Sequence, residues 1–388
     1  MAHSPGVLIF VLAVGFILYV LFGYPLCLAW LARRRPRPVQ VRPSLKTVSI
    51  LLPVRNGEPW LRQKLKSICE LEYPRHLLQI LVISDGSTDQ TDGIATEFAS
   101  EGVRLLRIEQ SGKAVAINHG LEQATGEIVF FTDVRQNLEP NSLRFLVECF
   151  EDATVGVVSG ELVIVDGANR EQANVGLYWK YEKWIRNHLS QLDSVLGATG
   201  CIYAIRRSLA VPLPAGVLLD DVYEPMAAFF RGYRAVLDMR AKAYDYPTAL
   251  SSEFRRKVRT LAGVFQIIRC YPRLILPSNR MWFHFMSYKL GRLLLPYALL
   301  TVAASSFLLP SPLRECALAG QIGFYTLALI DRWVPERSKL KRLSSPICVF
   351  VVLMAAAICA ASILFRSSES LWKKTDVGAP AGHMGVVA

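Results

Sequence analysis

Uncharged apolar stretches near both ends of the chain constrain its fold more than any other feature. No residue between Ser4 and Ala32 is charged, and Val7–Leu31 exceeds the roughly 20 apolar residues that cross a bilayer as a helix. Three more uncharged runs lie toward the other end: Leu293–Leu313, Cys316–Ile330 and Leu343–Phe365. The 388-residue chain is therefore expected to be an integral membrane protein with four spans and a soluble region after the first.

Basic residues beside these runs predict the orientation. Six cations and no acid lie in residues 33–46, after the first run, whereas a cleaved signal peptide carries basic residues before a shorter run. The positive-inside rule places the N-terminus outside and the following chain in the cytoplasm, in a plasma or inner membrane. The basic loop 331–342 agrees. Four spans put the C-terminal tail outside, against the charges of Lys373 and Lys374.

The net charge of +12 bears on the class of partner. Residues 33–46 contribute six positive charges and residues 253–292 a net eight, which together exceed the excess of the whole chain. Because this charge lies beside apolar runs and no nucleic-acid recognition motif is present, a nucleic-acid binder is excluded. A hydrophobic content of 52% excludes disorder, and eight scattered Cys without a CxxC pair predict reduced packing residues.

Between the apolar ends, short strand-like runs alternate with helical spacing. The predicted strands are Thr47–Val54, Leu77–Ser84, Val103–Ile108 and Ile128–Thr132. The predicted helices between them are Glu58–Leu71, Asp89–Ser100 and Ala114–Ala124. This order predicts an α/β fold with a mostly parallel sheet, in which ligands bind beyond the carboxyl ends of the strands.

Polar residues follow each predicted strand. They are Pro53-Val54-Arg55-Asn56-Gly57-Glu58, Ser84-Asp85-Gly86-Ser87-Thr88-Asp89, Gly112-Lys113-Ala114 and Thr132-Asp133-Val134-Arg135. Taken alone, the segment after Asp85 reads equally as a turn with a helix cap, and Lys113 as a solvated lysine. Together they predict one polar crevice for a phosphorylated ligand, because a lysine at a helix N-terminus suits phosphate.

At these motifs the chain resembles membrane-integrated family 2 glycosyltransferases. The ordered set is SILLPVRNGE, LVISDGSTDQT, GKAVAINHG, VFFTDVRQ, GATGCIYAIRRS, LLDDVYEP and RRKVRT, and it covers essentially the whole chain. The resemblance implies a Rossmann-like fold of GT-A type and a nucleoside-diphosphate sugar donor, with UDP the expected nucleotide. It also implies roles for individual residues: Pro53, Asn56 and Glu58 border the nucleoside, Asp85 contacts the base or ribose, and Lys113 lies near the phosphates.

One motif departs from the family pattern. The family's DxD holds a divalent metal with two carboxylates, whereas here the motif is Asp133-Val134-Arg135. Mg²⁺ and Mn²⁺ prefer oxygen ligands, so we expect Asp133 to bind such a metal only weakly, with help from the diphosphate and water. Alternatively, Arg135 itself offsets diphosphate charge, or it points away and pairs with an acid such as Glu139.

Two further motifs are implied to serve the acceptor. Asp220 and Asp221 open a predicted helix, Val222–Phe230, where acids also suit the positive helix end. In the family pattern the second acid is the general base, so Asp221 is the expected base beside Asp220. The small-residue loop at Gly197, Thr199 and Gly200 is implied to shape the acceptor site, although a tight turn accounts for it equally well.

A basic cluster follows at residues 255–260. Processive family members carry QxxRW here, and if Arg259 matches the Arg of that motif, Thr260 replaces the Trp. This replacement favours a lipid acceptor receiving few sugars, with Arg259 holding the diphosphate. The alternative is a basic face on the membrane surface. Residues 271–292, aromatic and basic, are expected to lie on the cytoplasmic leaflet among membrane lipids.

The expected organisation follows from these patterns. The segments are an N-terminal transmembrane helix (1–32), a basic linker (33–46), a cytoplasmic GT-A domain (47–270), an interfacial segment (271–292), three transmembrane helices (293–366) and a tail (367–388). The expected function is inverting transfer of a sugar from a nucleotide-sugar donor to a lipid or glycan hydroxyl. The alternatives are a processive polysaccharide synthase coupled to export and a nucleotide-binding membrane scaffold without turnover; the oligomeric state is left open.

Overall fold

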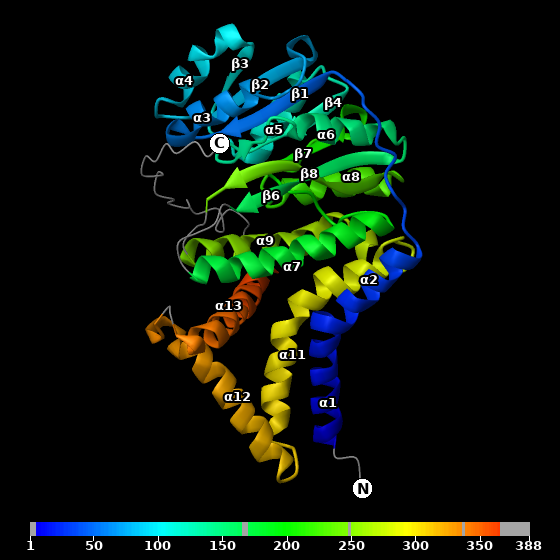
Figure 1. Cartoon of the computed structure of the whole chain (residues 1–388), viewed down its shortest axis with the longest axis vertical. Helices are drawn as coiled ribbons and strands as arrows, with labels where there is room; N and C mark the ends of the chain where they lie inside the picture. The colour runs from blue at the N-terminus through cyan, green and yellow to red at the C-terminus, as the bar shows by residue number, and fades with distance from the viewer. Residues whose placement is uncertain (1–4, 165–169, 247–249, 336–337, 365–388) are drawn as a thin grey trace. The chain divides into compact units, whose positions relative to one another are not determined.

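The computed structural model describes residues 5–164, 170–246, 250–335 and 338–364, and its elements are labelled in Figure 1. The chain forms two compact units. Of the described residues, the sheet unit contains 39–164, 197–246 and 250–252, and the helical unit contains 5–38, 170–196, 253–335 and 338–364. The expected C-terminal tail, with Lys373 and Lys374, lies outside the described residues, and the predicted domain ranges stay predictions.

Eight strands in the described residues form one mixed sheet, in the order β3-β2-β1-β4-β7-β6-β8-β5. They are β1 Val48–Val54, β2 Leu78–Asp85, β3 Val103–Ile108, β4 Ile128–Phe131, β5 Asn137–Leu138, β6 Val155–Ile164, β7 Tyr203–Arg206 and β8 Arg234–Asp245. The first four strands are parallel, as the sequence predicts. Beyond them, β7 runs antiparallel to both β4 and β6, which makes the sheet mixed.

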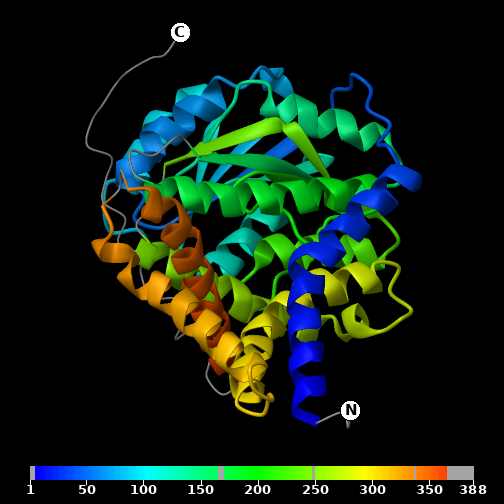
Figure 2. The same ribbon diagram turned by 60° about the horizontal axis from the view of Figure 1, so that its bottom comes forward.

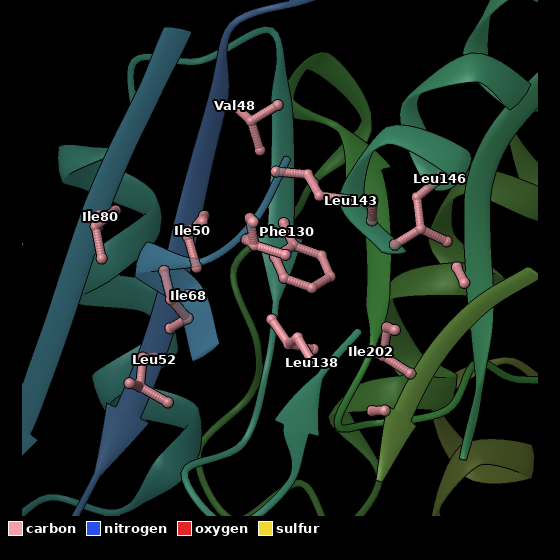
Figure 3. Packing of buried hydrophobic residues seen from close by; sticks show 14 of the residues in the cluster. Val48, Ile50, Leu52, Ile68, Ile80, Phe130, Leu138, Leu143, Leu146 and Ile202 are labelled. Atoms are coloured by element: carbon pink, nitrogen blue, oxygen red, sulfur yellow. The ribbon is translucent and has the colours of Figure 1, made fainter. Parts of the chain in front are cut away.

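Helices cover both faces of the parallel half. Helices α3 (Glu58–Cys69) and α6 (Ser142–Glu148) pack on one face, where Ile50 and Phe130 meet Ile68 and Leu143 (Figure 3). Helix α5 (Lys113–Gln123) packs on the other face. There a Cβ at Gly120 would lie 3.2 Å from the Leu51 Cδ2 atom, so the missing side chain lets this helix approach closely. Strand β1 is buried on both faces for this reason.

Two further helices complete the sheet unit. Helix α4 (Thr91–Glu97) follows β2, and helix α8 (Asp220–Phe230) precedes β8. Pro53 lies near the end of β1, where proline removes a backbone donor. The β1–β4 pairing stops at Leu51 opposite Phe131, so Pro53 lies beyond the last pair with β4 and breaks no bond there.

The helical unit carries the apolar ends of the chain. Its elements are α1 Pro5–Leu18, a π-helix Tyr19–Gly23, α2 Tyr24–Arg34, α7 Arg170–Leu192, α9 Leu250–Cys270, α10 Trp282–His284, a π-helix Phe285–Leu290, α11 Gly291–Ser306, α12 Leu313–Ile330 and α13 Lys339–Ala360. The wide turn before α2 precedes Pro25, whose ring cannot join a regular α-helical ladder. Helix α1 packs along α11, and α12 along α13 (Figures 1 and 2).

Two continuous helical stretches in the described residues are long and apolar enough to cross a membrane. They are Pro5–Arg34 and Lys339–Ile363. They coincide with the first and last apolar runs of the sequence, while the middle two runs fall on α11 and α12. Within this unit the buried Asp331 carboxylate accepts hydrogen bonds from Lys341 Nζ at 3.1 Å and Ser344 Oγ at 2.6 Å, which ties the α12–α13 connection.

Candidate active site

The loops after β1 and β2 are hydrogen-bonded into one piece. Asn56 has a left-handed backbone (φ 50°); its N–H donates to Ser87 Oγ at 3.1 Å and its Oδ1 accepts from the Thr88 N–H at 2.8 Å. The Glu58 carboxylate accepts from the Gln90 N–H at 3.1 Å. These side chains therefore organise loop backbone in this structure. Their predicted role at the nucleoside, and that of the half-buried Pro53, stay predictions.

Asp85 binds the backbone at the start of α5. Its buried carboxylate accepts the backbone N–H groups of Ser111 at 2.6 Å and Gly112 at 3.0 Å. Gly112, at φ 91°, has a backbone conformation that side-chain-bearing residues rarely adopt. Because Gly112 is the N-cap of α5, Asp85 fixes where the helix begins and so where Lys113 starts. The predicted contact of Asp85 with a base or ribose stays a prediction.

Lys113 joins two of the predicted site acids. Its Nζ lies 3.0 Å from Asp133 Oδ1 and 3.1 Å from Asp220 Oδ2. Burial alone would lower the pKa of Lys113, but the attraction of Asp133, Asp220 and Asp221 outweighs burial and raises that pKa above its ordinary value. The lysine is therefore a fixed positive charge where the ends of β4 and α8 meet.

Arg135 is held by an acid other than the one the sequence suggests. Its guanidinium donates to Asp245 Oδ2 at 2.5 Å, and Gln136 Nε2 donates to the same oxygen at 2.8 Å. Glu139 instead lies 3.8 Å from Lys242. Strand register is the reason: β5 pairs antiparallel with β8, with Asn137 opposite Tyr244, so the residues just before β5 lie beside the end of β8.

A buried lysine lies under the same segment. Lys64, from α3, is fully buried and donates from Nζ to Thr132 Oγ1 at 2.7 Å and to the Gln136 carbonyl at 2.5 Å. Burial lowers its pKa to about 7, although Cys201 and Asp133 act in the opposite direction. Sequence reasoning missed Lys64, because a lysine in an amphipathic helix is expected on the solvated face. Only its place between Leu61 and Leu65, on the apolar side, hints at burial.

The acid pair and the small-residue loop are brought together. Asp221 lies in the first turn of α8, and its backbone carbonyl accepts the Ala198 N–H at 2.7 Å. A Cβ added at Gly200 would lie 3.1 Å from Asp221 Oδ2, and one at Gly197 would lie 2.8 Å from Val222. Thr199 is tied down by its hydroxyl, which donates to the Gly160 carbonyl at 2.8 Å. The absence of a side chain at Gly200 lets the loop backbone lie close to the Asp221 carboxylate.

Two buried polar groups behind this pair escaped the sequence analysis. Glu224 lies one turn after Asp220 in α8 and is fully buried; one oxygen accepts the Val211 N–H at 3.2 Å. Burial, with Asp220 nearby, raises the pKa of Glu224 to about 8. Tyr203 stacks on Phe131 with ring centroids 4.6 Å apart. In the described part of the chain, neither the Tyr203 hydroxyl nor the second Glu224 oxygen has a hydrogen-bond partner.

The residues present do not form a protein metal site. Within the described residues, no group of three or more His, Cys, Asp or Glu side chains is placed to hold an ion. Asp133 is the one acid of its motif, and its carboxylate already contacts an ammonium group. Arg259 lies in α9, in the helical unit, and its predicted contact with the diphosphate stays a prediction.

The comparisons with known proteins follow this geometry. Residues 49–211 match the model of "Glycosyl transferase family 2". Among curated relatives, a probable glycosyltransferase of Bacillus subtilis is 30% identical over 132 residues, covering 32% of this chain and 31% of that protein. A β-monoglucosyldiacylglycerol synthase of a Nostoc species is 33% identical over 132 residues, covering 33% of this chain and 28% of that protein. The chain thus spans about 30% of the length of these relatives.

A solved structure is similar over nearly the whole chain. It is a mannosyltransferase from Pyrobaculum calidifontis in complex with GDP-Man and Mn²⁺, 24% identical, with a TM-score of 0.72. The match covers 95% of this chain and 100% of that one. This likeness shows the fold, which is of GT-A type and confirms the fold class predicted from the sequence.

Proposed function

Because residues 49–211 form a family 2 glycosyltransferase domain, we propose that the chain is an inverting glycosyltransferase using a nucleoside-diphosphate sugar. The acceptor in this proposal is a hydroxyl group of a membrane lipid or glycan. One observation carries it above the others: the Lys113 ammonium lies between Asp133 and Asp220, and Asp221 follows Asp220 in the first turn of α8. A cation for a leaving diphosphate and a base for an incoming hydroxyl are thus close together.

The proposed reaction is a single displacement. The acceptor oxygen bonds to the anomeric carbon as its proton passes to the Asp221 carboxylate. The bond from that carbon to the diphosphate oxygen breaks on the opposite face, and the electron pair leaves with the diphosphate. Lys113 offsets the charge that develops there. The acceptor reaches the partly exposed Asp221 beside the loop at Gly197 and Gly200, and attack opposite the leaving group inverts the anomeric carbon.

The sequence also predicts a divalent metal bound weakly at Asp133. Mn²⁺ is present in the solved mannosyltransferase complex, and bound to a diphosphate such an ion would supply positive charge. In this chain one carboxylate paired with Lys113 does not fit a protein-held ion. We therefore assign no step of the reaction to a metal.

A lipid acceptor fits the rest of the chain better than a growing polymer. The stretches Pro5–Arg34 and Lys339–Ile363 fit membrane spans by length and composition, and we propose that they anchor the enzyme with α11 and α12. We propose the orientation predicted from the basic residues, with the sheet unit in the cytoplasm. One curated relative is named for glycolipid synthesis, while another is a poly-β-1,6-N-acetyl-D-glucosamine synthase. Thr260, in place of the aromatic residue of processive members, favours the first.

The decisive experiment compares wild type with Asp221→Asn. The full chain in lipid nanodiscs is given radiolabelled UDP- and GDP-sugars with a membrane lipid extract, and the lipid fraction is analysed by mass. We expect one added sugar with wild type and a loss of about 10²–10⁴-fold in the variant, the usual contribution of a general base. Equal turnover in the two proteins would overturn the role of Asp221. A long polymer would identify the synthase, and no turnover with any donor would favour the scaffold.

A further inference from the structure

The surroundings of Asp133 are unusual for a residue expected to bind a divalent cation. Three basic side chains approach the segment from Thr132 to Gln136. Lys113 contacts the Asp133 carboxylate directly. Lys64 donates hydrogen bonds to Thr132 and Gln136, the two ends of the segment. The third, Arg135, stands where a second carboxylate would complete a two-acid metal site. Lysine and arginine groups therefore already occupy the polar contacts of this segment.

The contacts of Arg135 hold its guanidinium in place. Its ion pair with Asp245 is shielded, since the Asp245 side chain is only 5% exposed, and Gln136 binds the same carboxylate oxygen. Swinging Arg135 away would leave a buried, negatively charged group without its cation, which is costly. The guanidinium is thus committed to the fold, and it neither ligates a metal nor leaves room for a carboxylate that would.

Lys113 has the capacity to receive the diphosphate itself. An ammonium group has three N–H donors. Two point to acceptors at Asp133 and Asp220, which leaves one for a diphosphate oxygen. The two carboxylates fix the position of the ammonium before any ligand arrives, so little freedom is lost on binding. A divalent ion at Asp133 would instead be repelled by an ammonium 3.0 Å from the same carboxylate.

We propose that Lys113, clamped between Asp133 and Asp220, is the resident cation for the donor diphosphate, and that this chain binds its donor without a divalent metal. The proposal rests on the proposed function, because it specifies how that donor is held. It assigns Asp133 the task of positioning Lys113, in place of the metal-binding role expected from the sequence.

The test measures binding, which separates it from turnover. UDP and GDP are titrated into the full chain in nanodiscs by calorimetry, once in EDTA and once in Mn²⁺. We expect the Kd of the better nucleotide to differ by less than about threefold between the two conditions. Electron paramagnetic resonance of Mn²⁺ is expected to show no ion held by the protein alone. Binding that vanishes in EDTA and returns with Mn²⁺ would overturn the proposal while leaving the donor class intact.

Matched variants assign the effect to the ammonium. Lys113→Met is expected to weaken nucleotide binding more than about tenfold, while Lys113→Arg retains most of it. Arg107→Met removes an exposed cation of the same unit and is expected to change nothing. Circular dichroism checks that each variant is folded. Full binding by Lys113→Met would overturn the proposal, and a wild type that binds neither nucleotide under either condition would overturn the proposed function as well.

Discussion

The carboxyl ends of β2 and β4 each carry an aspartate, and the surroundings of the two differ. Asp85 is buried and accepts backbone N–H groups of the next helix entry. Asp133 is 37% exposed and pairs with the side chain of Lys113. From sequence alone both look like ligand-binding acids. The structure indicates that Asp85 organises the backbone, whereas Asp133 positions the charge of Lys113. Substituting Asp85 should therefore lower stability, and substituting Asp133 should lower turnover.

The largest effect expected within this comparison is on turnover, at Asp133. Asp133→Asn removes one of the two ion pairs that hold Lys113, and the loss of positioning is expected to reduce turnover by up to about 10²-fold. Denaturant unfolding should change little, because the side chain is partly solvated. Glu97→Gln, which breaks an exposed ion pair with Arg62, is the control and should affect neither quantity. A large stability loss in Asp133→Asn would show that Asp133, like Asp85, has a structural role.

Asp85 should behave in the opposite way. Asp85→Ala leaves the backbone N–H groups of Ser111 and Gly112 without their acceptor, which is expected to lower the free energy of unfolding by about 2 kcal/mol. Denaturant titration of the full chain measures this. Asp85→Asn retains one acceptor oxygen and should lose less. If both variants unfold like wild type yet fail to bind nucleotide, Asp85 is a ligand contact after all.

A smaller effect is expected at the partner of Arg135. Asp245→Asn keeps the side-chain shape but removes the charge that holds the guanidinium. We expect a loss of about 1 kcal/mol in the free energy of unfolding, since Arg135 is 24% exposed and partly screened. Nucleotide binding should stay independent of Mn²⁺. The appearance of a Mn²⁺ requirement in this variant would show that the ion pair excludes the metal.

The last prediction concerns Glu224, where the expected effect on stability changes with pH. A carboxyl with a folded pKa of about 8 and an ordinary value of 4.5 keeps its proton in the folded state while the unfolded chain releases it. Wild-type stability therefore falls as pH rises from 4.5 to 8, and it falls no further from this group above 8. Glu224→Gln should match wild type near pH 5 and be the more stable protein at pH 9. Parallel stability curves for the two proteins would contradict the buried, protonated carboxyl.

The sequence predicts the parallel half of the sheet well, for a physical reason. Strands buried on both faces are near-continuous apolar runs, and β1, β2 and β4 are of this kind, whereas β3 is an edge strand with exposed arginines. The antiparallel half is harder, because its pairing depends on contacts far apart in the chain. Arg135 meets Asp245, 110 positions away, and no local pattern predicts which acid a cation will reach. The site acids Asp133, Asp220 and Asp221 could be anticipated because each follows an apolar run.

The sequence analysis also did not predict that two ionisable side chains are buried. Lys64 and Glu224 lie in amphipathic helices, where a charged residue is ordinarily assigned to solvent. Both are buried with hydrogen bonds to backbone groups. The specific partner compensates for desolvation, and that partner is known only once the helix has been docked.

The joined loops after β1 and β2 have a consequence for exchanging donor preference between relatives. Asn56 and Glu58 bind the backbone of residues 88–90, so neither loop has a shape independent of the other. A loop transplanted alone would arrive without its acceptors and would distort its neighbour. Residues 54–58 and 86–91 should therefore be exchanged together, and a change in one loop should be matched by a change in the other.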